Sequence, residues 1–209
     1  QMATAYGVFA NGGYRVNPWL ISKVTEQTGK VLMENKPQVL DDSVRAIDPR
    51  NAFMMTSLLQ EVTRSGTAAR AQATLKRSDL FGKTGTTNDS MDAWFAGFQP
   101  SIVAITWMGY DTPRKLGSNS LATGGGLSLP IWISFMEHAL KGVPVMTYTP
   151  PEGVINTGGE WYYSEFAYGK GVASLGMEDA TPAQAPVGTE ATQPTEERNR
   201  ILDLFRNNR

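Results

Sequence analysis

Apolar side chains near the N-terminus recur every three or four residues, which is the spacing of one helix face. The residues that share this spacing are Met2, Ala5, Tyr6 and Phe9. The glycines at 12 and 13 then predict the end of the helix, because glycine readily adopts the backbone conformation of a helix C-terminus. No capping residue precedes the helix, so we expect the chain to be a piece of a longer polypeptide.

Two further helices are predicted downstream. Asp48-Pro49 has the pattern of an N-cap followed by proline, and a stripe of core residues continues from it to Ser65-Gly66. The stripe consists of Ala52, Met55, Leu59 and Val62. Ser128 is expected to cap a helix over residues 129–141, which ends at Gly142. Because this last helix is apolar nearly all round, we expect it to be buried between layers.

Runs of β-branched and aromatic residues predict strands between these helices. The predicted strands are residues 14–24, 30–35, 80–87, 93–98 and 102–110. The turns at Gln27-Thr28-Gly29 and Gln99-Pro100-Ser101 join the first and last pairs as hairpins. The predicted fold class is therefore α/β in the wider sense of α+β, with an antiparallel sheet flanked by helices.

The composition divides the chain into three parts. Residues 1–146 hold the predicted helices and strands, and residues 147–177 are expected to form an extended segment on the surface. Residues 178–209 are mostly Ala, Thr, Pro, Gln and Glu, which predicts a low-complexity, flexible tail. A short amphipathic helix at 200–209 is the alternative for its end, although a frayed terminus fits the composition better.

Charge and residue counts exclude several kinds of partner and site. A net charge of −1 and a pI near 5.9 argue against nucleic acid, which requires a basic surface. No run of about 18 apolar residues is present, so this segment does not itself span a membrane. With no cysteine and a single histidine, the chain lacks disulfides, a thiol nucleophile and the common zinc motifs. We therefore predict no metal and no cofactor.

The run with the most chemical information is Gly82-Lys83-Thr84-Gly85-Thr86-Thr87. Two glycines inside a strand suggest that another backbone or a ligand approaches closely. Lysine and threonine supply an ammonium and hydroxyls, which bind a carboxylate or transfer a proton. The alternative is a solvated edge strand followed by a turn. Strand alternation puts Thr84 and Thr86 on one face and Lys83 on the other.

Other candidate motifs carry less information. Residues 65–70 either end a helix or line a site, and the sequence leaves both roles open. The glycines at 124–126 are not a phosphate loop, because no Gly-Lys-Ser/Thr follows them. His138 lies within a predicted helix, where a packing role is expected. Asp92 and Asp111 flank a predicted strand pair and are interpreted as turn-forming residues.

Several phrases occur in an order that resembles the class A penicillin-binding proteins, in particular the 1A type of Gram-negative bacteria. They are Met2-Ala3-Thr4-Ala5-Tyr6, Phe9-Ala10-Asn11-Gly12-Gly13-Tyr14, Ser65-Gly66-Thr67-Ala68, Phe81-Gly82-Lys83-Thr84-Gly85-Thr86-Thr87-Asn88-Asp89, Asp92-Ala93-Trp94-Phe95-Ala96-Gly97-Phe98 and Pro130-Ile131-Trp132-Ile133-Ser134-Phe135-Met136. In this enzyme group a Lys-Thr-Gly motif acts together with Ser-x-x-Lys and a second serine motif. The resemblance covers residues 1–145 and implies a β-lactamase/transpeptidase-like fold for residues 1–146.

The resemblance implies a peptidoglycan D,D-transpeptidase that is acylated by β-lactams and cross-links stem peptides through a serine acyl-enzyme. It also implies a place at the periplasmic face of the bacterial inner membrane. An upstream membrane helix and an upstream glycosyltransferase domain are implied in the same way. A serine β-lactamase or D,D-carboxypeptidase is an alternative, and so is a non-catalytic domain that senses β-lactam or peptide.

The two companion motifs are missing from this chain. None of its thirteen serines has a lysine three residues on or an asparagine two residues on. We therefore expect an incomplete domain with no nucleophile, which is inactive alone because nucleophile and base must lie within hydrogen-bond reach. The N-terminal part of the same polypeptide is the expected partner that carries Ser-x-x-Lys and Ser-x-Asn.

The resemblance also implies roles for single residues. Lys83 would hold a proton-relaying serine and attract the substrate carboxylate. Thr84 and Thr86 would bind that carboxylate, and the Thr86 N–H would be one oxyanion-hole donor. Gly85 would let the peptide lie against the strand as an added β-strand, and Thr87 completes the expected substrate-binding set.

Overall fold

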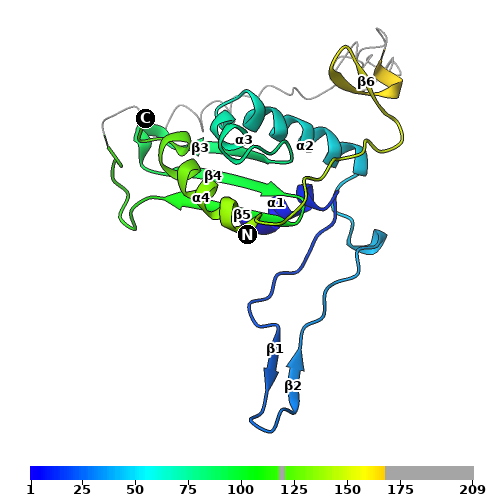
Figure 1. Cartoon of the computed structure of the whole chain (residues 1–209), viewed down its shortest axis with the longest axis vertical. Helices are drawn as coiled ribbons and strands as arrows, with labels where there is room; N and C mark the ends of the chain where they lie inside the picture. Colours follow the sequence, from blue (N-terminus) through cyan, green and yellow to red (C-terminus); the bar gives the residue numbers. More distant parts are fainter. Residues whose placement is uncertain (118–120, 168–209) are drawn as a thin grey trace, which may run out of the picture. The chain divides into compact units, whose positions relative to one another are not determined.

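Figure 1 shows the computed structural model, which describes residues 1–117 and 121–167. The low-complexity tail predicted at 178–209, the alternative helix at its end and the last part of the extended segment lie outside these residues. Within the described residues, no helix combines the length and the apolar character that a membrane crossing requires.

The centre of the fold is a three-stranded antiparallel sheet with the order β3-β4-β5. Its strands are β3 (Phe81–Thr86), β4 (Ala93–Gln99) and β5 (Ile102–Met108), which confirms three of the predicted strands. β4 lies in the middle and pairs with both neighbours along its length. The predicted class, an antiparallel sheet flanked by helices, is thus confirmed, and β3 forms one edge of the sheet.

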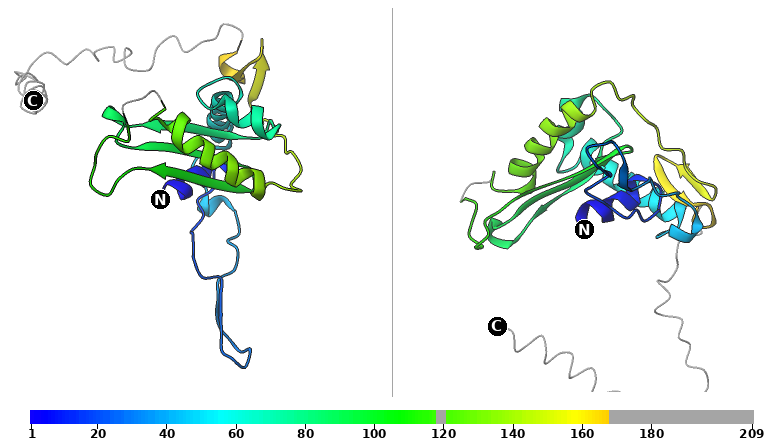
Figure 2. Two further views of the ribbon diagram at one scale, coloured as in Figure 1. Left: turned by 60° about the vertical axis from the view of Figure 1, so that its left-hand side comes forward. Right: turned by 90° about the horizontal axis from the view of Figure 1, so that it is seen from below.

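Helices cover both faces of this sheet. The α-helices of the described residues are α1 (Met2–Ala10), α2 (Pro49–Arg64), α3 (Ala69–Leu75) and α4 (Leu129–Ala139). Three of them confirm predicted helices, whereas α3 was not predicted. The right-hand view of Figure 2 shows α1 and α4 on opposite faces of the sheet. Ser128 precedes α4 but does not cap it, because its hydroxyl donates to the Ala93 carbonyl oxygen at 2.6 Å.

The face under α4 is packed with large side chains. Phe95 of β4 and Trp132 of α4 are fully buried, and their rings meet edge to face with centroids 4.9 Å apart. The Trp132 indole N–H also donates to the Ala104 carbonyl oxygen at 3.1 Å. The prediction that α4 is buried between layers is wrong for the part of the chain that the structure describes, because the sheet covers one side of the helix only. Ile131 and Phe135 remain about half exposed.

The face under α1 has a core of its own. Phe81 of β3 stacks on Phe98 of β4 with centroids 5.0 Å apart, and Leu59 and Ala10 join the cluster. Tyr148 packs edge to face on Phe81, and its hydroxyl donates to the Ala10 carbonyl oxygen at 2.6 Å. Burial raises the pKa of Tyr148 to about 12. The hydroxyl therefore stays protonated at neutral pH and ties the chain after α4 to α1.

α2 begins as predicted, because the Asp48 side chain accepts a hydrogen bond from the Arg50 N–H at 2.8 Å. Its buried face differs from the predicted stripe, since Met55 is 37% exposed. The buried positions are Ala52, Phe53, Thr56, Leu59 and Thr63. Threonine is tolerated there because its hydroxyl finds a backbone acceptor, and Thr63 donates to the Leu80 carbonyl oxygen at 2.5 Å.

Two smaller hairpins are separate from the central sheet. Their strands are β1 (Lys23–Thr25), β2 (Val31–Glu34), β6 (Val154–Thr157) and β7 (Glu160–Tyr163). The strand predicted at 14–24 is much longer than β1, whereas the one predicted at 30–35 is close to β2, and neither β1 nor β2 has a buried residue. A two-stranded hairpin that packs against no other layer has little to stabilise longer strands. The second hairpin packs on α2, where Phe53 and Trp161 meet edge to face at 4.9 Å.

One carboxylate is buried just before β3. Asp79 accepts hydrogen bonds from the Arg77 guanidinium at 2.7 and 2.9 Å, and from the Gln99 side chain and the Met146 N–H at 3.0 Å. Burial acts to raise the pKa of Asp79, but these donors outweigh it and hold the pKa below its ordinary value. Arg77 also donates to the Val143 carbonyl oxygen at 2.6 Å, so the pair fastens the chain after α4 to the sheet.

Candidate active site

The Lys-Thr-Gly run lies on the edge strand β3. Antiparallel pairing sets Thr84 directly opposite Phe95, whose ring belongs to the core under α4. Residues opposite each other in a sheet share a face, and side chains alternate along a strand. Thr84 and Thr86 therefore lie on the face of α4, and Lys83 lies on the face of α1.

Lys83 borders a pocket of about 350 Å³ on the α1 face. The pocket is lined by Met2, Tyr6, Lys83, Thr84, Gly85, Trp94 and Ala96. The Lys83 ammonium donates to the Thr84 carbonyl oxygen at 2.9 Å, and it forms no ion pair within residues 1–117 and 121–167. Because an ammonium has three donors, two remain for a ligand. Burial raises the pKa of Tyr6, whose neutral hydroxyl is a further donor in this lining.

The hydroxyls of Thr84 and Thr86 each meet a partner from a distant part of the chain. Thr84 Oγ1 lies 2.8 Å from Thr67 Oγ1 in the loop after α2. Thr86 Oγ1 accepts a hydrogen bond from the Gly124 N–H at 3.0 Å. Of the two roles left open for residues 65–70, the Thr67 contact supports the one in which this loop borders the candidate site.

The two glycines of β3 have different surroundings. A Cβ at Gly82 would lie 2.7 Å from the Ala96 carbonyl oxygen and 2.9 Å from Gly97 Cα, which are backbone atoms of the paired strand. A Cβ at Gly85 would lie 3.3 Å from Trp94 Cβ, a contact that a small shift relieves. Gly82 is therefore required for packing inside the sheet. Gly85 has no side chain and so leaves the strand backbone open to the pocket.

Replacing Gly82 by alanine is expected to lower the free energy of unfolding by about 1–3 kcal/mol, the usual cost of extra volume in a packed site. Gly85→Ala is the matched variant and is expected to cost less, because its neighbour can move. Chemical denaturation of both variants beside the wild type measures the difference. Equal losses in the two variants would contradict the packing role of Gly82.

A π-helical turn, Gly124–Ser128, leads into α4 and lies against the sheet. A Cβ at Gly124 would lie 2.6 Å from the Gly85 carbonyl oxygen and would overlap the Trp94 carbonyl oxygen. Only glycine fits at this position. The sequence excludes a phosphate loop here but does not reveal the contact with β3. The signal available for it is the cluster of glycines itself, since glycine marks close backbone approach.

Thr87 lies just beyond β3 and closes a turn. Its N–H donates to the Asp92 carbonyl oxygen at 3.1 Å, and its hydroxyl accepts from the Asp92 N–H at 2.8 Å. The Asp92 carboxylate accepts from the Trp107 indole N–H at 2.9 Å, which agrees with the turn-forming role interpreted from the sequence. Asp89 and Ser90 have φ angles of 60° and 53°, a backbone region that is uncommon for residues other than glycine.

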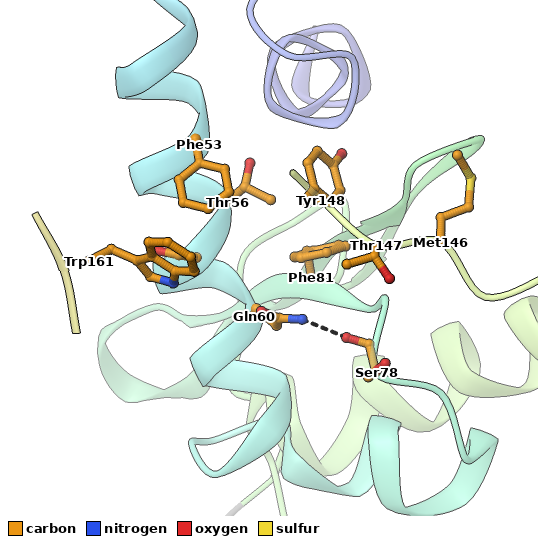
Figure 3. Close-up of a pocket in the computed structure, with 10 residues that line it drawn as sticks. Phe53, Thr56, Gln60, Ser78, Phe81, Met146, Thr147, Tyr148 and Trp161 are labelled. Carbon is orange, nitrogen blue, oxygen red and sulfur yellow. Dashed lines mark hydrogen bonds between the residues drawn. The ribbon is translucent and has the colours of Figure 1, made fainter. Parts of the chain in front are cut away.

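A second pocket, of about 210 Å³, lies between α2, the start of β3 and the chain around residue 147 (Figure 3). The rings that surround it belong to Phe53, Phe81, Tyr148 and Trp161. Across its floor the Gln60 side chain donates to the Ser78 carbonyl oxygen at 2.7 Å. No lining residue is charged at neutral pH, so this pocket offers no group for acid–base chemistry. The Lys-Thr-Gly strand remains the candidate active site.

Comparison with known proteins agrees with this geometry. Residues 1–131 match the family described as penicillin binding protein transpeptidase domain. Penicillin-binding protein 1A of Neisseria flavescens is 45% identical over 166 residues, which are 79% of this chain and 20% of that protein. This chain therefore spans about a fifth of the length of the curated relatives it matches.

Solved structures give the same result. The crystal structure of penicillin-binding protein 1A from Haemophilus influenzae superposes with a TM-score of 0.69 at 31% identity, over 78% of this chain and 31% of that one. A penicillin-binding protein from Mycobacterium tuberculosis superposes with a TM-score of 0.61 at 28% identity, over 72% of this chain and 40% of that one. Because the family match contains all three strands of the central sheet, this chain belongs to the penicillin-binding protein transpeptidase family.

Proposed function

We propose that the longer polypeptide carrying this chain is a serine-type D,D-transpeptidase that cross-links peptidoglycan. In that reaction a serine oxygen attacks the carbonyl carbon of the D-Ala-D-Ala bond, and the C–N bond breaks. The terminal D-alanine leaves with a proton on its nitrogen. An amine of a neighbouring stem peptide then takes the acyl group and restores the serine. In this proposal the Ser-x-x-Lys motif, which holds the attacking serine, and the Ser-x-Asn motif belong to the N-terminal part of the same polypeptide, outside residues 1–209.

The observation that carries the proposal is the position of Lys83–Thr86 on the edge strand of the sheet. On its outer side, this stretch pairs with no strand of the described residues, so an extended substrate peptide can add there as a further strand. Gly85 presents no side chain against such a peptide. The Thr86 N–H then serves as one donor to the oxyanion that develops on the attacked carbonyl.

In this proposal the side chains of the run bind the substrate carboxylate and polarise the relay serine. The Lys83 ammonium attracts the substrate carboxylate and polarises the relay serine of the missing half. The Thr84 and Thr86 hydroxyls bind the carboxylate, which accepts hydrogen bonds only. Thr87 borders the same end of the site. The absence of an ion-pair partner for Lys83 among the described residues supports this assignment, because its charge is not neutralised locally.

The relatives supply the setting of the proposed activity. They are named penicillin-binding proteins, which supports β-lactams as substrate mimics that acylate the same serine. We infer a place at the periplasmic face of the bacterial inner membrane, with a membrane helix and a glycosyltransferase domain in the remaining length of the polypeptide.

Labelled penicillin tests the proposal on the full polypeptide. We expect one covalent adduct per polypeptide that survives denaturation and persists after free penicillin is removed. A chain limited to residues 1–209 should form no adduct, because it has no serine placed for acylation. Rapid release of hydrolysed penicillin would instead favour a serine β-lactamase.

Two further results would point to a different activity. Release of D-alanine from a stem peptide without any cross-linked product would favour a D,D-carboxypeptidase. Reversible binding of penicillin with no covalent adduct would favour a non-catalytic sensor. Intact-mass analysis and chromatography of the stem-peptide products distinguish these cases.

A further inference from the structure

We infer that Thr67 and the backbone N–H of Gly124 are positioning groups that orient the Thr84 and Thr86 hydroxyls toward a substrate carboxylate. The inference rests on the proposed function, since it refines how β3 recognises its ligand. Neither group belongs to the Lys-Thr-Gly run. Both reach β3 on the α4 face, from parts of the chain 17 and 38 residues away.

Thr67 is held firmly enough to position another side chain. Its neighbour Ala68 is fully buried, and the Ala68 N–H donates to the Val62 carbonyl oxygen at 3.0 Å. Gly66 makes the turn possible, because a Cβ there would lie 2.9 Å from Val62 Cα. The Thr67 hydroxyl is therefore presented to Thr84 by a backbone that α2 and α3 anchor on both sides.

Gly124 is held equally closely. Its Cα lies so near β3 and β4 that any side chain would overlap the Gly85 and Trp94 carbonyl oxygens. The Thr123 hydroxyl accepts a hydrogen bond from the Gly126 N–H at 3.1 Å, which closes the turn that carries Gly124. The Gly124 N–H thus meets the Thr86 oxygen from a fixed direction.

These contacts decide where the hydroxyl hydrogens can point. Thr86 Oγ1 already accepts from an N–H, so its own hydrogen is available to donate elsewhere. Thr67 and Thr84 share one hydrogen bond, which uses only one of their two hydrogens. Two O–H donors therefore remain on the α4 face of this strand. A carboxylate, which accepts and never donates, is the ligand chemistry that such a pair selects.

The competing interpretation gives Thr67 a structural role only, as the residue that links α2 to α3. The two interpretations differ in which ligand is affected. Loss of a positioning group weakens recognition of the carboxylate alone, whereas general damage to the domain weakens every reaction at the site. Penicillin and its carboxyl methyl ester separate the two, because they share the reactive ring and differ in the carboxylate.

The experiment measures the second-order rate of acylation of the full polypeptide by penicillin and by its methyl ester. Thr67→Val is expected to slow the acid roughly 3- to 10-fold, the range of one neutral hydrogen bond, and to leave the ester rate unchanged. Thr67→Ser should restore the acid rate. In a Thr84→Val background, Thr67→Val should have no further effect, because its partner is gone.

Gly124→Ala keeps the N–H but must displace it from Thr86, because the added Cβ overlaps backbone atoms of β3 and β4; it should slow both reactions and also lower the acid-to-ester ratio. This ratio stays informative if the variant folds less well, since partly unfolded protein slows both reactions equally. Thr28→Val, at an exposed hairpin position, is the matched control for the loss of a hydroxyl. Thr63→Val, which removes a buried hydroxyl bonded to Leu80, is the control for structural damage.

Equal slowing of acid and ester by Thr67→Val would overturn the positioning role, and so would an unchanged acid rate. A wild-type polypeptide that neither compound acylates would instead contradict the proposed transpeptidase. The two failures are therefore distinguishable.

Discussion

Replacement of Lys83 by alanine is expected to lower the acylation rate of the full polypeptide about 10²- to 10³-fold, the usual loss when one preorganised electrostatic group of an active site is removed. The stability of the domain should change little, because the Lys83 side chain is exposed and, among the residues that the structure describes, its only hydrogen bond is to the neighbouring Thr84 carbonyl oxygen. The measurement is the rate of labelled-penicillin incorporation, with thermal unfolding of the same preparation as the check on folding.

Two variants sharpen this result. Lys141→Ala removes an exposed lysine just beyond α4, outside the candidate site, and should acylate at the wild-type rate. Lys83→Arg keeps the positive charge but replaces the compact ammonium with a larger planar group, so it separates attraction of the carboxylate from the close hold on the relay serine. Full activity in Lys83→Ala would remove Lys83 from the catalytic set.

Replacement of Asp79 by alanine is expected to destabilise the domain by about 3–5 kcal/mol, the usual cost of removing one partner of a buried ion pair. The Arg77 side chain is only 11% exposed and would be left without its counter-charge. The Gln99 amide and the Met146 N–H would also lose their acceptor. Denaturant unfolding measures the loss. A loss no greater than that of an exposed pair would show that the buried network is not a major source of stability.

The matched control is Glu34→Ala, which breaks the exposed Lys23–Glu34 pair. Its expected cost is about 0–1 kcal/mol, because solvent screens the two charges and the side chains lose entropy on pairing. The contrast between the two carboxylates tests burial rather than charge alone.

Asp79 also predicts a dependence on pH. Its pKa in the folded state is held below the ordinary value, so its stabilising contribution is present above the unfolded pKa of about 3.9 and is lost as the pH falls through the folded pKa. The difference in unfolding free energy between Asp79→Ala and the wild type should therefore become smaller as the pH falls into this range. Unfolding free energies measured from neutral pH down into this range check the sign.

The sequence predicted those helices and strands that are marked by residues close together along the chain, such as caps, turns and periodic apolar positions. The helices at 2–10 and 49–64 have periodic apolar residues with a recognisable end or cap, and the sheet strands have alternating β-formers joined by a turn. The Lys-Thr-Gly run was also visible, because residue types and glycine spacing can be read from the sequence, and the chemistry expected of it stays a prediction. The register between β3 and β4 agrees with the alternation of side chains, which places Thr84 and Thr86 on one face of the sheet and Lys83 on the other.

Elements and contacts that depend on distant neighbours were not predicted. The strand at 14–24 shrinks to Lys23–Thr25 because no layer covers it, although its composition favours a strand. α4 leaves Ile131 and Phe135 exposed because only one sheet face meets it within the described residues. In both cases burial decides the outcome, and burial depends on what packs against an element rather than on the element's own residues.

By itself, then, the sequence determined the class of fold and the absence of Ser-x-x-Lys and Ser-x-Asn from these residues, and it predicted the kind of chemistry. Tertiary structure alone decided which groups surround that chemistry. Thr67 and Gly124 reach the two hydroxyls of β3 across 17 and 38 residues, and no periodicity or spacing links such positions. The physical reason is that hydrogen bonds form between groups that folding brings together, while sequence patterns report only the neighbours of each residue along the chain.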